Sequence, residues 1–440
     1  MANESGPGGA PPARAPQQAE FTGRYLLLGR QANDTGLPKT LRDKAGLTVA
    51  SSSDFPRGAV DMARFGGADG VYFEKLGVAV TSSAPDQGAP LMGPMSAGDL
   101  LTVERERIVY VFQAPRRDNA PMAMPARLGE FAPQGIDNLV CSLAAPSLFQ
   151  GPAEVDESAR TWGLASSRVI ESSWTGRGVR VAVLDTGFDL NHPDFAGRSV
   201  VSHSFIDGET AQDAHSHGTH CIGTALGPAR PPAPPRYGVA FAADIYAGKV
   251  LGNSGRGSDG AVLAAINWAM TNGCRVISMS LGSATQRGQR YSQVFETAAQ
   301  RAMAGNTIII AAAGNESDRN KDIINPVGHP ANCPSIMAVG AVDADMKIAY
   351  FSTRGMDPDG GGVDILGPGV NVYSTVPPGA HGRKNGTSMA TPHVAGIAAL
   401  YAEANPNATA REIWQLLVTN ARRLALDPAD MGAGFVQAPR

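Results

Sequence analysis

The sequence predicts an α/β protein with a largely parallel sheet, preceded by a smaller α+β unit. In the C-terminal two thirds of the chain, short apolar runs alternate with longer helical segments, which is typical of parallel strands joined by crossover helices. In the first quarter, short apolar runs alternate with polar segments, and one stretch favours a helix. These two patterns divide the chain into two folded regions.

The first folded region covers residues 21–113 and is expected to form a small α+β domain. Its strands are expected at residues 25–28, 47–49, 71–73, 78–80 and 108–112, with a helical turn at 40–45. Residues 114–158 are rich in Pro, Ala and Gly, so we expect an exposed linker that is open to cleavage.

The second region covers residues 159–440 and alternates strands with helices. Buried strands are expected at residues 180–184, 245–250, 276–278, 307–313 and 336–339. Helices are expected to begin near His215 and Ser388, and further helices at residues 258–271, 291–304 and 410–420. This alternation is what a parallel sheet covered by helices requires.

Composition excludes several classes of partner. A chain of 440 residues with 43% hydrophobic content can bury a large core and hold more than one domain. The net charge is −3, without a basic patch or a long charge block, so we expect no nucleic-acid partner. No apolar stretch is long enough to span a bilayer, so we expect no membrane partner.

The first 20 residues are rich in Gly, Pro and Ala and contain no apolar core, so we expect a disordered arm rather than a signal peptide. The four cysteines, Cys141, Cys221, Cys274 and Cys333, show no CxxC pairing, which fits buried thiols in a reducing compartment. We therefore expect a cytoplasmic protein, or one exported without a recognisable signal peptide.

Four polar residues stand at the ends of predicted strands or the starts of predicted helices. Ser388 follows a turn of small residues at the start of a helix, where peptide N–H groups can bind an anionic oxygen. A serine hydroxyl needs a base, and His217 opens another helix. Asp185 ends strand 180–184, and Asn315 follows strand 307–313 with a side-chain amide that can donate to an oxyanion.

In this order, the motifs closely resemble those of the subtilisin-like serine peptidases, the subtilases: Asp185-Thr186-Gly187, His217-Gly218-Thr219-His220, Ala313-Gly314-Asn315 and Gly386-Thr387-Ser388-Met389-Ala390. The resemblance covers roughly residues 160–440. It implies a three-layer catalytic domain at residues 159–440, an Asp185, His217 and Ser388 triad, and Asn315 in an oxyanion hole. It implies a serine endopeptidase whose chemistry requires no cofactor.

The same resemblance implies where a protein or peptide substrate binds. Gly255-Arg256-Gly257 and Ser280-Leu281-Gly282 match the two edges that hold the substrate as an added β-strand. The first specificity pocket would be lined by Ala312, Gly314 and Gly328, which suits a large apolar side chain, while Glu316 at its rim also suits Lys or Arg. Arg256 would favour a substrate that carries an acidic residue further upstream of the cleaved bond.

Structural readings compete with these assignments. Ser388 alone would be read as a helix cap and Asp185 as a turn residue. His215, His217 and His220 at close spacing are compatible with zinc, but such a site leaves Ser388 and Asn315 unexplained. We interpret His220 and His393 as buried structural histidines.

Calcium is a second metal to consider. Asp194 matches a calcium ligand of secreted subtilases, but the loop at 227–236 offers no carboxylate and contains two arginines, so we expect that site to be missing. A structural calcium site formed by Asp364 with the backbone carbonyls of Pro334 and Ile336 is a hypothesis, since these segments match another family site.

The resemblance also implies a role for residues 21–113. Such a unit in front of a subtilase domain resembles the propeptide that templates folding and then inhibits the enzyme from within the same chain. We therefore expect a self-processing zymogen, against the alternative of an accessory domain that is never removed. The functional alternatives are a dedicated peptide-maturation protease, a transpeptidase acting on a specific precursor, and a catalytically silent binding protein.

Overall fold

The computed structural model describes residues 19–33, 36–62, 67–82, 100–112, 156–356 and 361–440. The expected arm at 1–20 and linker at 114–158 therefore lie almost entirely outside the described residues, as does Cys141. Those two assignments stay predictions.

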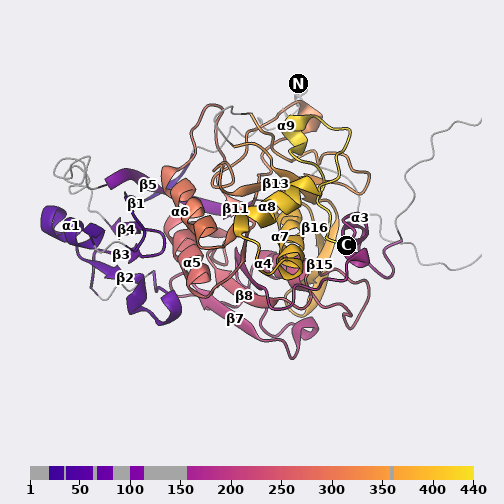
Figure 1. Ribbon diagram of the computed structural model, residues 1–440, viewed down its shortest axis with the longest axis horizontal. Helices are drawn as coiled ribbons and strands as arrows, with labels where there is room; N and C mark the ends of the chain where they lie inside the picture. Colours follow the sequence, from indigo (N-terminus) through magenta and orange to yellow (C-terminus); the bar gives the residue numbers. More distant parts are fainter. Residues whose placement is uncertain (1–18, 34–35, 63–66, 83–99, 113–155, 357–360) are drawn as a thin grey trace, which may run out of the picture.

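A seven-stranded parallel sheet forms the centre of the larger region (Figure 1). Its strand order is β14-β13-β12-β10-β6-β8-β7, and every neighbouring pair is parallel. In chain order the strands are β6 (Arg180–Asp185), β7 (Val200–Ser204), β8 (Asp244–Lys249), β10 (Val276–Met279), β12 (Ile308–Ala312), β13 (Met337–Val342) and β14 (Ile365–Pro368). The five predicted strands differ from β6, β8, β10, β12 and β13 only at their ends, whereas β7 and β14 were not predicted.

Helices cover both faces of this sheet. Val181 and Val183 of β6 pack into one hydrophobic cluster, whereas Ala182 and Leu184 pack into another, because alternate residues of a strand point to opposite faces. The first cluster contains α4 (His217–Leu226), α7 (Thr387–Ala404) and α8 (Ala410–Thr419), and the second contains α5 (Asp259–Thr271) and α6 (Gln293–Ala304). The predicted three-layer α/β fold is confirmed.

Shorter elements complete the larger region. A hairpin of β15 (Val372–Val376) and β16 (Ala380–Lys384) precedes α7. The remaining helices and turns are α3 (Trp162–Ser166), η3 (Val169–Glu171), η4 (Pro193–Phe195), η5 (Arg319–Lys321) and α9 (Pro428–Met431).

The N-terminal unit is a small sheet with one longer helix. Its elements are β1 (Phe21–Gly29), α1 (Gly36–Ala45), β2 (Val49–Ser51), η1 (Ser52–Asp54), η2 (Pro56–Gly58), β3 (Gly70–Phe73), β4 (Val78–Ser82) and β5 (Leu100–Val111). One face of the sheet packs on α1 and the other shares a core with α5 and α6. Figure 1 shows these indigo strands beside the two helices.

Strand β5 joins the two regions into one sheet. It pairs antiparallel with β1 inside the N-terminal unit, and with β9 (Arg256–Ser258) and β11 (Leu281–Gly282) of the larger region. The expected substrate edges are therefore occupied by a strand of the chain itself.

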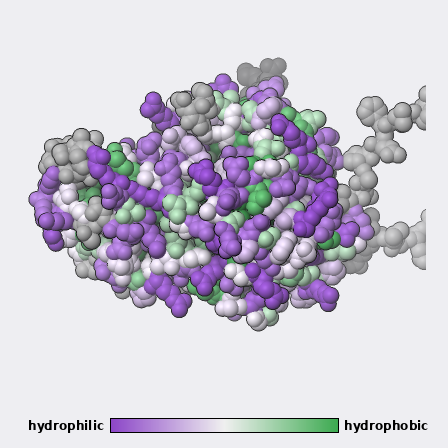
Figure 2. Space-filling view, in the orientation of Figure 1, coloured by the Kyte–Doolittle hydropathy of each residue, from purple (hydrophilic) through white to green (hydrophobic). Residues whose placement is uncertain are grey.

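The molecular face drawn in Figure 2 is mainly hydrophilic, with small hydrophobic areas between polar side chains. Within the part of the chain that the structure describes, no helix combines the length and the apolar character needed to cross a bilayer.

The burial of α7 generates a stability prediction. Ile397 on α7 is 0% exposed, whereas Ile323 is 38% exposed, so the two isoleucines form a matched pair. Ile397→Ala should lower the free energy of unfolding by about 2–5 kcal/mol because it leaves a cavity. Ile323→Ala should change it by no more than about 0.5 kcal/mol. Urea denaturation followed by circular dichroism checks both, and equal effects would contradict the described packing.

Candidate active site

Ser388 lies in the first turn of α7, next to a glycine that the site requires. Gly386 caps the helix with a φ of +151°, and a Cβ atom there would lie 2.9 Å from the Asn315 Nδ2 atom. A side chain at this position would displace the amide. The helix start thus brings Ser388 and Asn315 together, although α7 and β12 are far apart in the sequence.

Asp185 and His217 form a buried pair. Asp185 ends β6, His217 begins α4, and the His217 Nδ1 atom lies 2.7 Å from the Asp185 Oδ1 atom. Their exposed fractions are 0% and 4%. Because the carboxylate engages Nδ1, Nε2 is the nitrogen left for proton exchange, and among the described residues it has no hydrogen-bond partner.

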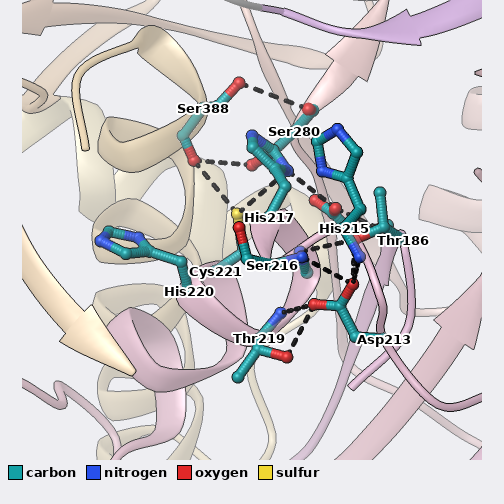
Figure 3. Close-up of polar contacts among 12 residues, drawn as sticks. Thr186, Asp213, His215, Ser216, His217, Thr219, His220, Cys221, Ser280 and Ser388 are labelled. Carbon is teal, nitrogen blue, oxygen red and sulfur yellow. Dashed lines mark hydrogen bonds and ion pairs between the residues drawn. The ribbon is translucent and has the colours of Figure 1, made fainter. Parts of the chain in front are cut away.

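The Ser388 hydroxyl points elsewhere. Its Oγ atom lies 3.3 Å from the Ser280 carbonyl oxygen and 3.5 Å from the Phe112 carbonyl oxygen, which are long for hydrogen bonds. Cys221 contacts the other atoms of both residues, with its Sγ atom 3.8 Å from His217 Nδ1 and 3.5 Å from the Ser388 carbonyl oxygen (Figure 3). In the described structure the Ser388 hydroxyl therefore makes no hydrogen bond to His217, and such bonds are often long or absent in enzymes without substrate.

The Asn315 side chain donates to a carbonyl group. Its Nδ2 atom is 3.0 Å from the Phe112 carbonyl oxygen. Its Oδ1 atom accepts from the Thr387 N–H and hydroxyl, both at 2.9 Å. These two donors assign the amide orientation, because the oxygen faces them and the nitrogen then faces Phe112. Sequence reasoning missed Thr387, which carries no signal beyond its place beside the serine.

Strand β5 contacts nearly all the expected substrate-edge residues. Tyr110 pairs with both Arg256 and Gly282, whereas the neighbouring residues pair with Gly257 and Leu281, and the Gly255 carbonyl accepts from the Val111 N–H at 3.0 Å. Ser280 differs, because its hydroxyl donates to the Ser388 carbonyl at 2.8 Å. It therefore supports α7.

The aromatic ring of Phe112 fills the space between Gly282 and Gly328. A Cβ atom on either glycine would collide with the ring. Of the other expected pocket residues, Ala312 is buried at the end of β12, and Gly314 has a φ of +124° beside Glu316. Sequence reasoning did not identify Phe112 as the occupant.

Two charged residues border this site. Glu316 is partly exposed, but its Oε2 atom is buried without a hydrogen-bond partner in the described structure, and this desolvation raises the pKa of the carboxyl to about 7. Arg256 pairs with Glu20 at 2.8 Å and lies 5.3 Å from the Tyr110 ring centre. Since both partners are about half exposed, that ion pair contributes little stability.

Two of the other histidines have structural partners. Nε2 of His220 lies 3.0 Å from the Val372 carbonyl, and burial lowers the His220 pKa to about 3. Nδ1 of His393 lies 2.8 Å from the Met389 carbonyl, and burial lowers its pKa to about 4. Both are therefore neutral side chains in the core.

Of the candidate metal residues, Asp364 and Asp194 already accept hydrogen bonds from the protein. Asp364 accepts from the Ala338 N–H at 2.7 Å, and burial raises its pKa to about 7. Pro334 and Ile336 lie just before β13, the first exposed and the second buried. Asp194 accepts from Tyr237 and from His381, the latter at 2.9 Å. In the described ranges, one group brings metal-binding atoms of three side chains within 4.8 Å of each other: Asp185, His217 and Cys221.

The sequence of this chain is similar to those of known bacterial proteases. Subtilisin E of Bacillus subtilis (strain 168) is 40% identical over 253 residues, covering 57% of this chain and 62% of that protein. The subtilisin of Bacillus pumilus is 40% identical over 253 residues, covering 57% and 86%. Alkaline elastase YaB of Bacillus sp. (strain YaB) is 37% identical over 319 residues, covering 72% and 79%.

The chain thus spans less than two thirds of the length of subtilisin E. A family model described as the Subtilase family matches residues 176–435, which is more than half of the chain. This protein therefore belongs to the subtilase family.

Proposed function

We propose that the protein is a serine endopeptidase in which Ser388 attacks the peptide carbonyl. The observation that carries the proposal is the position of the Phe112 carbonyl oxygen, 3.0 Å from Asn315 Nδ2 and 3.5 Å from Ser388 Oγ. An oxyanion donor and a hydroxyl on one peptide carbonyl are the arrangement that acyl transfer needs.

The reaction begins when the Ser388 hydroxyl rotates toward His217 and gives its proton to Nε2. Asp185 holds the imidazole through Nδ1 and stabilises the imidazolium. The oxygen of the tetrahedral intermediate receives the Asn315 amide hydrogen bond. In a subtilisin, a relative of this chain, loss of one such donor lowers kcat by about 10²–10³-fold, and that magnitude belongs to the relative. The intermediate then collapses: the C–N bond of the peptide breaks, the His217 imidazolium gives its proton to the leaving amine, and the acyl-enzyme remains. Water, deprotonated by His217, then hydrolyses the acyl-enzyme, and no step requires a cofactor.

The substrate backbone binds as β5 does, between β9 and β11. Its main-chain groups pair with both edges, and the side chain before the cleaved bond enters the pocket lined by Gly282 and Gly328. Because the phenyl ring of Phe112 fills this pocket, we propose that the enzyme cleaves after large aromatic residues.

We propose further that the N-terminal unit is an intramolecular inhibitor that the enzyme removes itself. Two carboxylates of β5 attach the N-terminal unit to the larger region, where they accept hydrogen bonds at the starts of α5 and α6. Glu106 is fully buried and accepts from the Gly260 N–H at 2.9 Å at the start of α5, while Glu104 accepts from the Ser292 hydroxyl at 2.6 Å at the start of α6. Carboxylates at helix N-termini are stabilised by the peptide dipoles. The bond in position for cleavage joins Phe112 to Gln113.

The alternatives of a dedicated maturation protease or a transpeptidase use the same acyl-enzyme. The relatives named above are subtilisins and an alkaline elastase, and their names favour neither alternative.

Self-cleavage is testable by intact-mass analysis. Wild type should release a fragment ending at Phe112, because that carbonyl lies at Ser388, and Ser388→Ala should remain full length. Phe112→Asp should slow the cleavage, because a carboxylate entering the glycine-lined pocket loses its hydration. Cleavage at another bond, or equal cleavage in Ser388→Ala, would refute the proposal.

The raised pKa of Glu316 predicts pH-dependent specificity. Its carboxyl is neutral below about pH 7 and charged above it. We compare kcat/KM for two matched peptides, one with Lys and one with Phe before the cleaved bond. The Lys-to-Phe ratio of kcat/KM should rise about fivefold from pH 6 to pH 8, as expected of an ion pair worth about 1 kcal/mol. Glu316→Gln should give a flat ratio. A ratio that rises equally in both proteins would exclude Glu316 as the cause.

The calcium hypothesis gives a second pH prediction. With a pKa of about 7, the Asp364 carboxyl holds a proton at pH 6 that a calcium ion would have to displace. If Asp364 binds calcium with the Pro334 and Ile336 carbonyls, added Ca²⁺ should raise Tm at pH 8 more than at pH 6, and Asp364→Asn should remove the effect. Calorimetry with chelator and with calcium measures it. An unchanged Tm at pH 8 would reject this site.

A further inference from the structure

The Asp213 carboxylate accepts hydrogen bonds from both chain segments that carry Asp185 and His217, through Thr186 of the first and Thr219 of the second (Figure 3). It is 2% exposed and accepts five hydrogen bonds. Oδ1 accepts from the Thr186 hydroxyl and from two successive backbone N–H groups, all at 2.9 Å, and Oδ2 accepts from the N–H and hydroxyl of Thr219 at 2.9 and 2.7 Å. Both oxygens are therefore fully used.

These bonds connect the neighbours of the proposed acid–base pair. Thr186 follows Asp185, and its hydroxyl donates to Asp213 while accepting from the Gly218 N–H at 2.8 Å. Gly218 follows His217. A continuous hydrogen-bonded path thus runs from the loop after β6 to the first turn of α4, beside the 2.7 Å contact between the carboxylate and the imidazole.

Asp213 also fixes the turn that leads into α4. Ser216 has a φ of +83°, a left-handed conformation that residues other than glycine rarely adopt. The N–H groups of His215 and Ser216 both donate to Asp213, and the Ser216 hydroxyl accepts from Lys384 at 2.9 Å. The next residue in the chain is His217, so the conformation of this turn sets the position of the His217 backbone and therefore of its imidazole.

We propose that Asp213 is a positioning residue that acts through Thr186 and the Ser216 turn to hold Asp185 and His217 in register. The inference rests on the proposed function, because the register affects a rate only if the pair is catalytic. A purely structural role for Asp213, as a cap on α4, would change stability and leave kcat of the folded enzyme unchanged.

The test measures kcat and KM of the processed enzyme with the peptide Val-Tyr-Val-Phe carrying a chromogenic amide, which repeats residues 109–112. Thr186→Val removes the hydroxyl and keeps the shape, and Thr186→Ser keeps the hydroxyl. Thr186→Val should lower kcat by about 10- to 100-fold with KM nearly unchanged. Thr186→Ser should retain most of the rate.

Asp213→Asn should lower kcat similarly, since an amide accepts at one atom only. Adding Thr186→Val to Asp213→Asn should lower kcat little further, because the Thr186 hydroxyl acts through Asp213. Asp189→Asn is the charge control. Asp189 is 4% exposed and accepts from Gln212 at 3.0 Å and the Gly379 N–H at 2.9 Å, so this variant should keep the wild-type kcat.

Folded Thr186→Val and Asp213→Asn enzymes with wild-type kcat would overturn the inference and leave the proposed function standing. Additive losses in the double variant would also overturn it. If Asp213→Asn does not fold, the comparison of Thr186→Val with Thr186→Ser decides the question. Wild type that fails to cleave the peptide at all would refute the proposed function, and the inference would fall with it.

Discussion

Strand β5 pairs on one side with β9 and on the other with β11, and this main-chain pairing fixes the register of everything at the candidate site. Because the pairs end at Val111, the next carbonyl, that of Phe112, lies at the Asn315 amide. If the strand slipped by one residue, each of its side chains would turn to the other face of the sheet. The same pairing therefore sets both the pocket occupant and the peptide bond that faces Ser388.

The parallel sheet explains why distant residues meet here. Asp185 ends β6 and Asn315 follows β12, at the carboxyl edge where open α/β folds build their sites. Helices α4 and α7 pack against each other on one face of the sheet and bring their first turns to this edge. Each proposed catalytic group thus lies at or next to the end of an element that is buried in the core.

Much of this arrangement could be predicted from local sequence patterns. Five strands of the main sheet were predictable because both of their faces are buried and their residues are mostly apolar, as at 308–312. Strand β7 was not predicted, because it contains two serines and a histidine and is only partly buried, and the short strand β14 was not predicted either. Asp185, His217, Asn315 and Ser388 stood out as polar residues at element ends. Contacts between distant segments were not predictable. Asn315 meets Thr387, 72 residues away, and Thr186 meets Asp213, 27 residues away, and neither side chain has a distinctive pattern. The position of the proposed processing bond depends on strand register, which no local pattern encodes.

The central claim is that Ser388 is the nucleophile and that His217 activates it. The most direct measurement is the site of reaction with a fluorophosphonate, located by peptide mass mapping of the processed protein and of a His217→Ala variant. We expect a single adduct on Ser388 in wild type and a labelling rate reduced by orders of magnitude in the variant. An unmodified Ser388 in wild type, or equal labelling in both proteins, would contradict these roles of Ser388 and His217.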